Sequence, residues 1–337
     1  MDAIVLVGGQ GTRLRPLTHT RHKSLVPVCN RPAIEYLFSW LEANGFQRSV
    51  LAIGRYNEDL ADAYRAGRPG GLEVVLVEET ERLESGGGIR NAVEESGIDD
   101  RFVVLNGDVF VDFDFAPALR QHIAQEADLT LALHPEDDPS QYGVAVVDEL
   151  GRVTGFVEKP PLGTAPSNLV NAGVWIFERA LVDQIPPGAV RVEETLFPSL
   201  VARRRTVLGY QFPGLWADIG TPARYLALNR AILERDSVTV DGPGAIIDPA
   251  AQVRASSLGP GSTVAAGARV DGSILWEGVT VAAGAEVEGS ILADGVRIGE
   301  RARVLGAVIG SGAVIAAGVT VPPGTLIEPG TRYDGKS

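Results

Sequence analysis

Cysteine and lysine are both scarce in this sequence of 337 residues. The single cysteine, Cys29, excludes an internal disulfide framework and is typical of a protein in a reducing cytosol. Only three of the 30 basic residues are lysines, and one of them, Lys336, lies in the terminal tail. The other two, Lys23 and Lys159, each lie beside a proline-marked turn. An ammonium is a compact point charge whereas a guanidinium is a wide planar fork, so these two positions indicate sites that arginine does not fit.

Long apolar runs and an excess of positive charge are absent as well. No apolar run reaches the roughly 18 residues needed to cross a membrane, and no basic region precedes the apolar run at 3–7. We therefore expect no signal peptide, no membrane partner and a cytoplasmic protein. A net charge of −13 argues against a nucleic-acid partner, because phosphate contacts need clustered basic residues. Residues 1–25 nevertheless hold four basic side chains against Asp2 alone, which favours a local site for an anionic substrate.

Residues 1–235 alternate short β-branched runs with helical stretches, which predicts an α/β domain with a mostly parallel sheet. Ligands of such sheets bind beyond the carboxyl ends of the strands. A glycine loop follows the first expected strand there, and Asp108 follows the fourth. The expected strands are 3–7, 49–53, 72–77, 102–105, 129–133, 144–147, 153–158, 172–177 and 206–211. The expected helices are 33–44, 58–65, 87–95, 115–125, 193–203 and 222–234.

A regular apolar repeat follows an expected linker at 236–244. Apolar residues recur in steps of 6, 6 and 5, which gives a period of 17. A chain with three short strands per turn and one inward residue per strand has this spacing, so we expect a triangular parallel β-helix over 245–331. The faces and edges of such a domain suit self-association, which predicts a homo-oligomer. The glycines expected at its corners are Gly261, Gly267, Gly278, Gly284, Gly295, Gly299, Gly312 and Gly318.

The glycine loop Gly8-Gly9-Gln10-Gly11-Thr12-Arg13 lacks side chains where phosphates would approach. Successive backbone N–H groups can then cradle a triphosphate. A dinucleotide-binding fingerprint needs a further glycine where Leu14 stands, and the Gly-Lys-Ser/Thr of a Walker loop is absent.

A series of short motifs in fixed order resembles the sugar-nucleotide pyrophosphorylases, a nucleotidyltransferase family. It departs from the usual family pattern at His22 and Ser24, where proline is common. The resemblance is strongest to mannose-1-phosphate guanylyltransferases, and it implies a Rossmann-like, glycosyltransferase-A-like mixed sheet followed by a left-handed β-helix. The motifs are residues 6–28, Glu84–Gly88, Asn106–Asp108, Tyr142–Val144, Glu158–Pro160, Asn171–Gly173, Val192–Leu200 and Trp216–Pro222.

The resemblance implies a reaction and a role for each matching residue. The reaction is NTP plus sugar 1-phosphate to NDP-sugar plus pyrophosphate, with Mg²⁺ as cofactor. Arg13 would hold the β- and γ-phosphates, Lys23 the α-phosphate, and Asp108 and Asp218 the metal. Arg13, Lys23 and Asp108 are the expected catalytic residues. The expected nucleotide-binding residues also include Leu6, Gly8, Gly9, Gly11, Thr12, Gly86 and Gly87. The sugar phosphate would contact Gly143, Glu158, Lys159 and Asn171.

Simpler interpretations of these residues stay open. Asp108 is also a residue typical of turns, Asp218 could cap a helix, and Asn171 could cap backbone groups. Glu158 and Lys159 could be a solvated pair. Acyl transfer on the β-helix is disfavoured because all four histidines precede residue 235. A regulatory paralogue without activity is disfavoured because Arg13, Lys23, Asp108 and Asp218 are all present. GTP with mannose 1-phosphate is the favoured substrate pair, and UTP or dTTP with glucose 1-phosphate or another sugar 1-phosphate is the alternative.

Overall fold

The computed structural model describes residues 1–54, 57–236 and 239–335, and it divides into two compact units. The first, which we call the sheet unit, contains residues 1–9 and 34–216. The second, the β-helix unit, contains 10–33 and 217–337. The segment 10–33 thus belongs to the same compact unit as the β-helix. These two units do not coincide with the domains expected from the sequence, and the expected domain boundaries stay a prediction. Lys336 lies outside the described residues.

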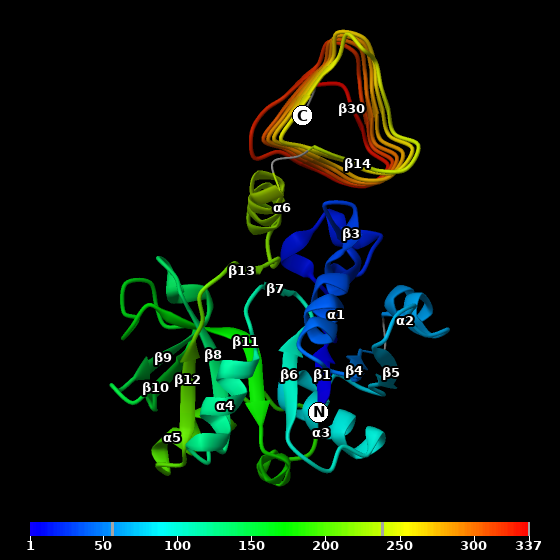
Figure 1. Cartoon of the computed structure of the whole chain (residues 1–337). Coiled ribbons are helices and arrows are strands. Elements are labelled where there is room, and N and C mark those ends of the chain that lie inside the picture. The colour runs from blue at the N-terminus through cyan, green and yellow to red at the C-terminus, as the bar shows by residue number, and fades with distance from the viewer. Residues whose placement is uncertain (55–56, 237–238, 336–337) are drawn as a thin grey trace. The chain divides into compact units, whose positions relative to one another are not determined.

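A mixed sheet forms the core of the sheet unit, and Figure 1 shows its strands β6 and β1 side by side. The strand order β10-β9-β11-β6-β1-β4-β5 is joined by β8 and β12 on the β11 side. Pairs β6/β1, β1/β4, β4/β5 and β8/β12 are parallel, whereas β11 runs antiparallel to β6, β8 and β9. The strands are β1 (Asp2–Leu6), β4 (Arg48–Ile53), β5 (Glu73–Glu78), β6 (Phe102–Asn106), β8 (Leu129–Pro135), β9 (Gly143–Val147), β10 (Val153–Glu158), β11 (Leu169–Phe177) and β12 (Val207–Gln211).

Helices cover this sheet and bury its apolar runs. Ile89, Ala92 and Val93 of α3 share one core with Ile4, Val50 and other sheet residues, because these apolar side chains leave water together. Among the described residues, no helix has both the length and the apolar character needed to cross a membrane. The helices are α1 (Ala33–Ala43), α2 (Glu58–Tyr64), α3 (Glu84–Ser96), α4 (Ala116–Ala124) and α5 (Leu196–Ala202), with 3-10 turns at Pro139–Gln141 and Arg179–Gln184.

The sequence placed two helix starts wrongly. Helix α3 begins at Glu84 rather than at 87, so the glycine run forms its first turn. Helix α5 begins at Leu196 rather than at 193. Strand β7 (Val109–Val111) and strand β13 (Trp216–Asp218) were not expected at all, because each is too short to show a periodic pattern.

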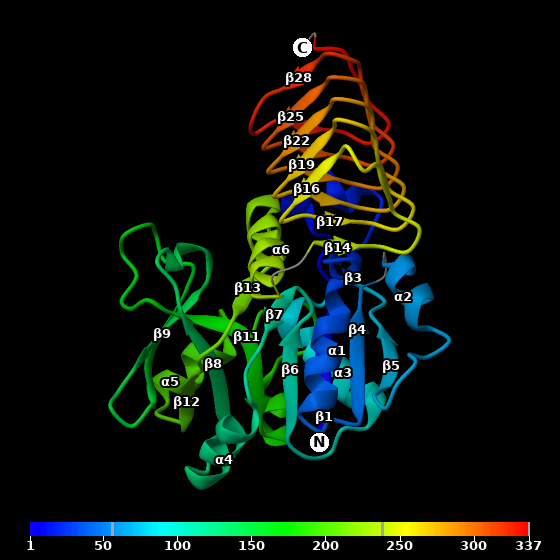
Figure 2. The same ribbon diagram turned by 45° about the horizontal axis from the view of Figure 1, so that its top comes forward.

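The second unit contains the expected β-helix, whose coils trace a triangle in Figure 1 and a stack in Figure 2. Strands one coil apart pair in parallel with an offset of 17 residues, as between Ser257 and Ile274. The expected inward residues from Leu258 to Val321 are all buried in one core. The first side is the sheet β14 (Val240–Asp241), β17 (Ser257–Leu258), β20 (Ile274–Leu275), β23 (Ile291–Leu292), β26 (Val308–Ile309) and β29 (Leu326–Ile327). The second side is β15 (Ile246–Ile247), β18 (Thr263–Val264), β21 (Thr280–Val281), β24 (Arg297–Ile298), β27 (Val314–Ile315) and β30 (Arg332–Tyr333). The third side is β16 (Gln252–Arg254), β19 (Arg269–Asp271), β22 (Glu286–Glu288), β25 (Arg303–Leu305) and β28 (Thr320–Val321).

Left-handed backbone at the corners explains most of the glycines. Seven of the eight expected corner glycines have positive φ, which an L side chain adopts only with strain. Gly299 does not, and Arg301 takes its corner with φ 54°. Gly299 instead lies where a Cβ would be 2.6 Å from the nitrogen of Ala317 on the next coil.

A column of buried serines lies at the five-residue step of the repeat. The Ser256 hydroxyl accepts the backbone N–H of Ser273 at 3.0 Å, and the Ser273 hydroxyl accepts that of Ser290 at 3.1 Å. The Ser290 hydroxyl accepts the N–H of Ala307 in the same way. Each hydroxyl thus satisfies a buried donor of the following coil.

The expected linker at 236–244 stays a prediction, and its described residues include the end of a helix and a first short strand. Residue 236 ends helix α6 (Pro222–Asp236), and residues 237 and 238 lie outside the described residues. Strand β14 then pairs with β17, so the first coil begins at Val240. The final coil holds one extra residue, because Val308 pairs with Leu326 at an offset of 18.

Candidate functional site

The glycine loop starts in the sheet unit, directly after β1, whose last residue is Leu6. Gly8 and Gly9 are exposed, and a Cβ on Gly9 would meet nothing within 4 Å. Gly8 lies beside a carboxylate, since a Cβ there would be 3.6 Å from Oε2 of Glu79. Asn57 supports the loop by donating its side-chain N–H to the Val7 carbonyl at 2.8 Å. The loop therefore presents open backbone, as a phosphate cradle requires.

Gly11 has a different role from the other loop glycines. Its φ is +61°, and a Cβ there would be 3.0 Å from Cβ of Lys23 and 3.1 Å from Cγ2 of Thr18. The Thr18 hydroxyl donates to the Gly11 carbonyl at 2.8 Å. Gly11 is therefore required by close packing against the stem of Lys23. Thr12 opens the 3-10 turn Thr12–Leu14 that follows.

Lys23 is 8% exposed and begins a short 3-10 turn, Lys23–Leu25. His22 caps that turn, because its Nδ1 accepts the backbone N–H of Ser24 at 3.1 Å. A buried lysine is rare, and a single such charge needs an anionic or polar environment. His22 and Ser24, which depart from the family's prolines, thus form a local cap of their own.

Arg13 and Asp218 both lie next to Gly220 in the β-helix unit. A Cβ on Gly220 would be 2.6 Å from Oδ1 of Asp218 and 3.0 Å from Nη2 of Arg13. The Asp218 carboxylate accepts the Gly220 N–H and pairs with Arg224 at 2.9 Å. Thr221 rather than Asp218 caps α6, since its hydroxyl accepts the N–H of Arg224 at 3.4 Å. The cation and the carboxylate expected at the site are thus neighbours.

Asp108 belongs to the sheet unit and lies in the turn between β6 and β7. Gly107 precedes it and donates its N–H to the Leu6 carbonyl at 2.9 Å. A Cβ on Gly107 would be 2.2 Å from Cγ1 of Val7, so only glycine fits there. The turn is therefore fixed against the start of the glycine loop, and the half-buried Asp108 follows directly.

Gly86 and Gly87 are buried in the first turn of α3 under the segment 188–190. A Cβ on Gly87 would be 2.2 Å from the Gly188 carbonyl oxygen, and one on Gly86 would be 2.9 Å from that of Val190. The Gly86 N–H donates to Val190 at 2.7 Å. These glycines have a packing role that the sequence did not predict, and their contact with a nucleotide stays a prediction.

The residues expected around the sugar phosphate include a compact charged group. Glu158, at the end of β10, pairs with Lys159 at 3.3 Å, and Arg191 lies 3.9 Å from the same carboxylate oxygen. A Cβ on Gly143 would be 2.7 Å from Oε2 of Glu158, so glycine is needed for this carboxylate to lie there. Lys159 has φ 45°, a left-handed conformation that is unusual for lysine.

Asn171 is fixed by its neighbours on β11. Its side-chain oxygen accepts the N–H of Gly173 at 3.1 Å and the indole N–H of Trp175 at 2.6 Å. The backbone-capping role left open by the sequence is therefore present. The side-chain amide nitrogen is the group that could donate to a sugar hydroxyl.

Glu79 is buried and Glu193 is half-buried, and neither was expected from the sequence. Burial raises the pKa of Glu79, against a hydrogen bond from the Leu83 N–H that lowers it. Burial also raises the pKa of Glu193, helped by the charge of Glu158 and opposed by a hydrogen bond from Ser85. Glu79 lies outside the family motifs and Glu193 lies within the motif Val192–Leu200, and in both cases only the tertiary packing shows that the carboxyl group is shielded from water.

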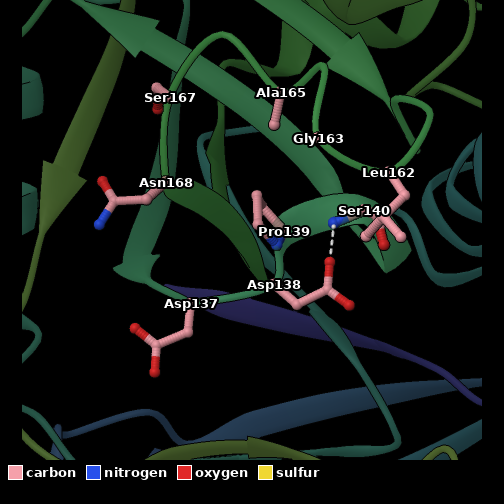
Figure 3. Close-up of a pocket in the computed structure, with 9 residues that line it drawn as sticks. All are labelled: Asp137, Asp138, Pro139, Ser140, Leu162, Gly163, Ala165, Ser167 and Asn168. Carbon is pink, nitrogen blue, oxygen red and sulfur yellow. Dashed lines mark hydrogen bonds between the residues drawn. The ribbon is translucent and has the colours of Figure 1, made fainter.

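A separate pocket of about 420 Å³ lies between the loops 137–140 and 162–168 (Figure 3). The Asp138 carboxylate accepts the N–H of Ser140 at 3.1 Å within it. The pocket is lined by none of the residues expected to bind nucleotide, metal or sugar phosphate, so it is distinct from the candidate active site.

The carboxylates expected to bind metal have suitable chemistry for Mg²⁺, which prefers oxygen ligands. Within 1–54, 57–236 and 239–335, no group of three or more His, Cys, Asp or Glu side chains could hold a metal ion. Protein side chains would then supply only one or two ligands, and substrate phosphates would supply others. That division is usual for Mg²⁺ in nucleotide enzymes.

Comparisons with known proteins decide the family. A family model described as nucleotidyl transferase matches residues 2–235. The chain belongs to this family. A second model, described as GlmU-like, C-terminal hexapeptide, matches residues 244–325, in agreement with the left-handed β-helix. The resemblance found in the sequence is thereby confirmed.

Individual relatives of this nucleotidyl transferase have two different names. The UTP–glucose-1-phosphate uridylyltransferase of Synechocystis is 32% identical over 262 residues, which cover 74% of this chain and 68% of the relative. The mannose-1-phosphate guanylyltransferase of Mycobacterium tuberculosis is 37% identical over 228 residues, which cover 67% and 63%. The chain thus spans about two thirds of the length of these curated relatives. The crystal structure of HddC from Yersinia pseudotuberculosis complexed with GMP-PN has 25% identity and a TM-score of 0.59, covering 68% of this chain and 99% of that one.

Proposed function

We propose that this protein transfers a nucleoside monophosphate from an NTP to a sugar 1-phosphate and releases pyrophosphate. The observation that carries the proposal is the pair of cations, Arg13 and Lys23, held in the segment 10–33. Lys23 is buried against Gly11, and Arg13 lies beside Gly220 and the Asp218 carboxylate. A phosphate-binding loop with two fixed cations suits a substrate with several phosphates.

The chemistry that follows needs no general base. An anionic oxygen of the sugar phosphate forms a bond to the α-phosphorus of the NTP, and the bond from that phosphorus to the β-phosphate oxygen breaks. Arg13 would hold the leaving pyrophosphate and Lys23 would neutralise charge at the α-phosphate, so catalysis rests on positioning and charge stabilisation. Asp108 and Asp218 are each proposed as Mg²⁺ ligands, and the ion would add Lewis-acid charge neutralisation.

The sugar phosphate is proposed to bind beside Glu158, Lys159 and Asn171. Lys159 offers an ammonium to the phosphate, and the Glu158 carboxylate offers an acceptor to sugar hydroxyls. Arg191, 3.9 Å from Glu158, joins this proposal because it adds a second cation to the same group.

GTP with mannose 1-phosphate is the proposed substrate pair. Several curated relatives have names with mannose-1-phosphate guanylyltransferase, and a related structure was solved with GMP-PN. UTP or dTTP with glucose 1-phosphate is the second candidate, because another relative is named a UTP–glucose-1-phosphate uridylyltransferase. A cytoplasmic location and a homo-oligomeric assembly are part of the same proposal.

The test is a matrix of four NTPs against several sugar 1-phosphates, with pyrophosphate release followed in the presence of Mg²⁺. We expect one pair to dominate, with GTP and mannose 1-phosphate highest. Release from no pair would overturn the catalytic proposal. Dominance of UTP or dTTP would overturn only the substrate assignment.

A further inference from the structure

Three consecutive residues of the segment 10–33 contact three consecutive coils of the β-helix. Arg21 pairs with Asp294 at 2.9 Å, Thr20 is hydrogen-bonded to Ser311 at 3.0 Å, and His19 lies 3.1 Å from Glu328. Asp294 and Ser311 occupy the same position of neighbouring coils, 17 residues apart, and Glu328 lies on the next coil. The segment therefore runs across the coils, roughly one residue to each.

Arg21 makes the most buried of these contacts. Its guanidinium carbon lies 5.3 Å from the ring centroid of Trp276, in a cation–π arrangement. The Trp276 indole N–H donates to the hydroxyl of Tyr225 at 2.9 Å, and that hydroxyl donates to the Pro27 carbonyl. Trp276 and Tyr225 are both buried, so these hydrogen bonds from the coil to Pro27 are shielded from water.

A second anchor lies on the other side of Lys23. The side-chain N–H of Asn30 donates to the Leu258 carbonyl at 2.6 Å, and the Ser257 hydroxyl donates to Asn30 Oδ1 at 3.1 Å. The Cys29 N–H donates to the side chain of Asn229 on α6 at 2.8 Å. Cys29 and Asn30 both have positive φ, so this turn is held in a conformation that needs tertiary support. Cys29 itself is half-buried.

Lys23 thus lies between two attachments to the β-helix unit, at 19–21 and at 27–30. Lys23 also packs against Gly11, which connects it to the turn that carries Arg13. A shift of either attachment would be transmitted along a segment of only a few residues. Precise placement of such cations matters for phosphoryl chemistry, because small displacements cost large factors in rate.

We propose that the β-helix positions the catalytic cations, with Asp294 and Trp276 as positioning residues that act through Arg21 on Lys23. The proposal rests on the proposed function for its kinetic part. Its structural part concerns the order of residues 12–26 and does not depend on turnover. The β-helix is then part of the catalytic apparatus in addition to any role in assembly.

The test compares Asp294→Ala with Glu286→Ala in the full chain. Glu286 is a matched control, since it forms an ion pair with Arg303 at 2.8 Å on the side of the β-helix formed by β22 and β25. Two measurements are made on each variant: hydrogen exchange of peptides covering 12–26, and kcat and KM for the best NTP and sugar phosphate pair. Trp276→Phe, which keeps a ring and removes the indole N–H, is the second test variant.

We expect Asp294→Ala to speed exchange in 12–26 by about 5- to 10-fold, the effect of losing a partly buried ion pair and weakening a cation–π contact. The value of kcat should fall by a similar factor while KM changes less, because Lys23 acts on charge that develops at the α-phosphate. Asp294→Glu should restore most of kcat. An Arg21→Ala, Asp294→Ala double variant should be no slower than the slower single variant.

Wild-type exchange and kcat in Asp294→Ala would overturn the proposal, as would equal effects in Glu286→Ala. Faster exchange with unchanged kcat would overturn the catalytic role alone. Faster exchange in a protein whose wild type releases no pyrophosphate from any substrate pair would instead overturn the proposed function and leave the structural coupling in place.

Discussion

Replacement of Gly11 by alanine tests whether this glycine exists to accommodate Lys23. Any L residue at its φ of +61° costs about 1–2 kcal/mol in the left-handed conformation. The new Cβ would also lie 3.0 Å from Lys23 Cβ and 3.1 Å from Thr18 Cγ2. Carbon atoms prefer separations of about 3.5–4.0 Å, and overpacking of a close-packed site adds about 1–3 kcal/mol. Gly11→Ala should therefore lower the free energy of unfolding by about 2–5 kcal/mol.

Gly278→Ala is the matched control. Gly278 belongs to the same unit, has φ +66°, and a Cβ there would meet nothing within 4 Å. Gly278→Ala should lower the free energy of unfolding only by the cost of the left-handed backbone conformation, about 1–2 kcal/mol. Urea unfolding of both variants gives the difference. In addition, kcat should fall at least about tenfold in Gly11→Ala, because a displacement of Lys23 worth about 1.4 kcal/mol of transition-state stabilisation has that effect. Equal unfolding free energies and equal kcat for the two variants would refute the reasoning.

Three further predictions concern the acids and the assembly. Asp108→Asn should abolish pyrophosphate release while circular dichroism and the unfolding midpoint stay at wild-type values, and retained turnover would remove Asp108 from the metal site. Burial raises the folded-state pKa of Glu79 above its unfolded value, so its contribution to stability falls as the pH rises from about 4. Glu79→Gln should therefore be more stable than wild type in urea at pH 8, and the difference should vanish near pH 4; an equal difference at both pH values would contradict this. Light scattering should give a mass of at least twice the 35.6 kDa of one chain, and a monomer at micromolar concentration would exclude the expected homo-oligomer.

The β-helix could be predicted almost residue by residue from the sequence. Each inward residue, such as Val270 or Val287, contacts its own equivalent one coil away, so a local period contains the tertiary contact. The exceptions are positions where the residue type departs from the one that the repeat has at the same place in other coils. Arg301 takes a left-handed corner that glycine takes in the adjacent coils, and nothing in the periodic pattern shows this.

The sheet unit was less predictable at its site. The start of α3 was missed because glycines disfavour helices, and the reason they are tolerated at 86 and 87 is the backbone of 188–190, about a hundred residues away in sequence. Arg13, Lys23, Asp108 and Asp218 were predicted as site residues from motifs that resemble the family, and their roles stay a prediction. The contact of Arg21 with Asp294, 273 positions along the chain, has no local signal.

The contacts of residues 19–21 with successive coils also constrain how the repeat array could change in evolution. Removal of one 17-residue coil between Trp276 and Ser311 would leave every remaining strand in register, and the shortened β-helix could still close its core. It would nevertheless bring Ser311 to the level at which Arg21 now meets Asp294, and the segment would face a hydroxyl in place of a carboxylate. Coils added beyond Tyr333 would disturb none of these pairings. Growth of the array is therefore free at its distal end and restricted at the coils that residues 19–21 contact.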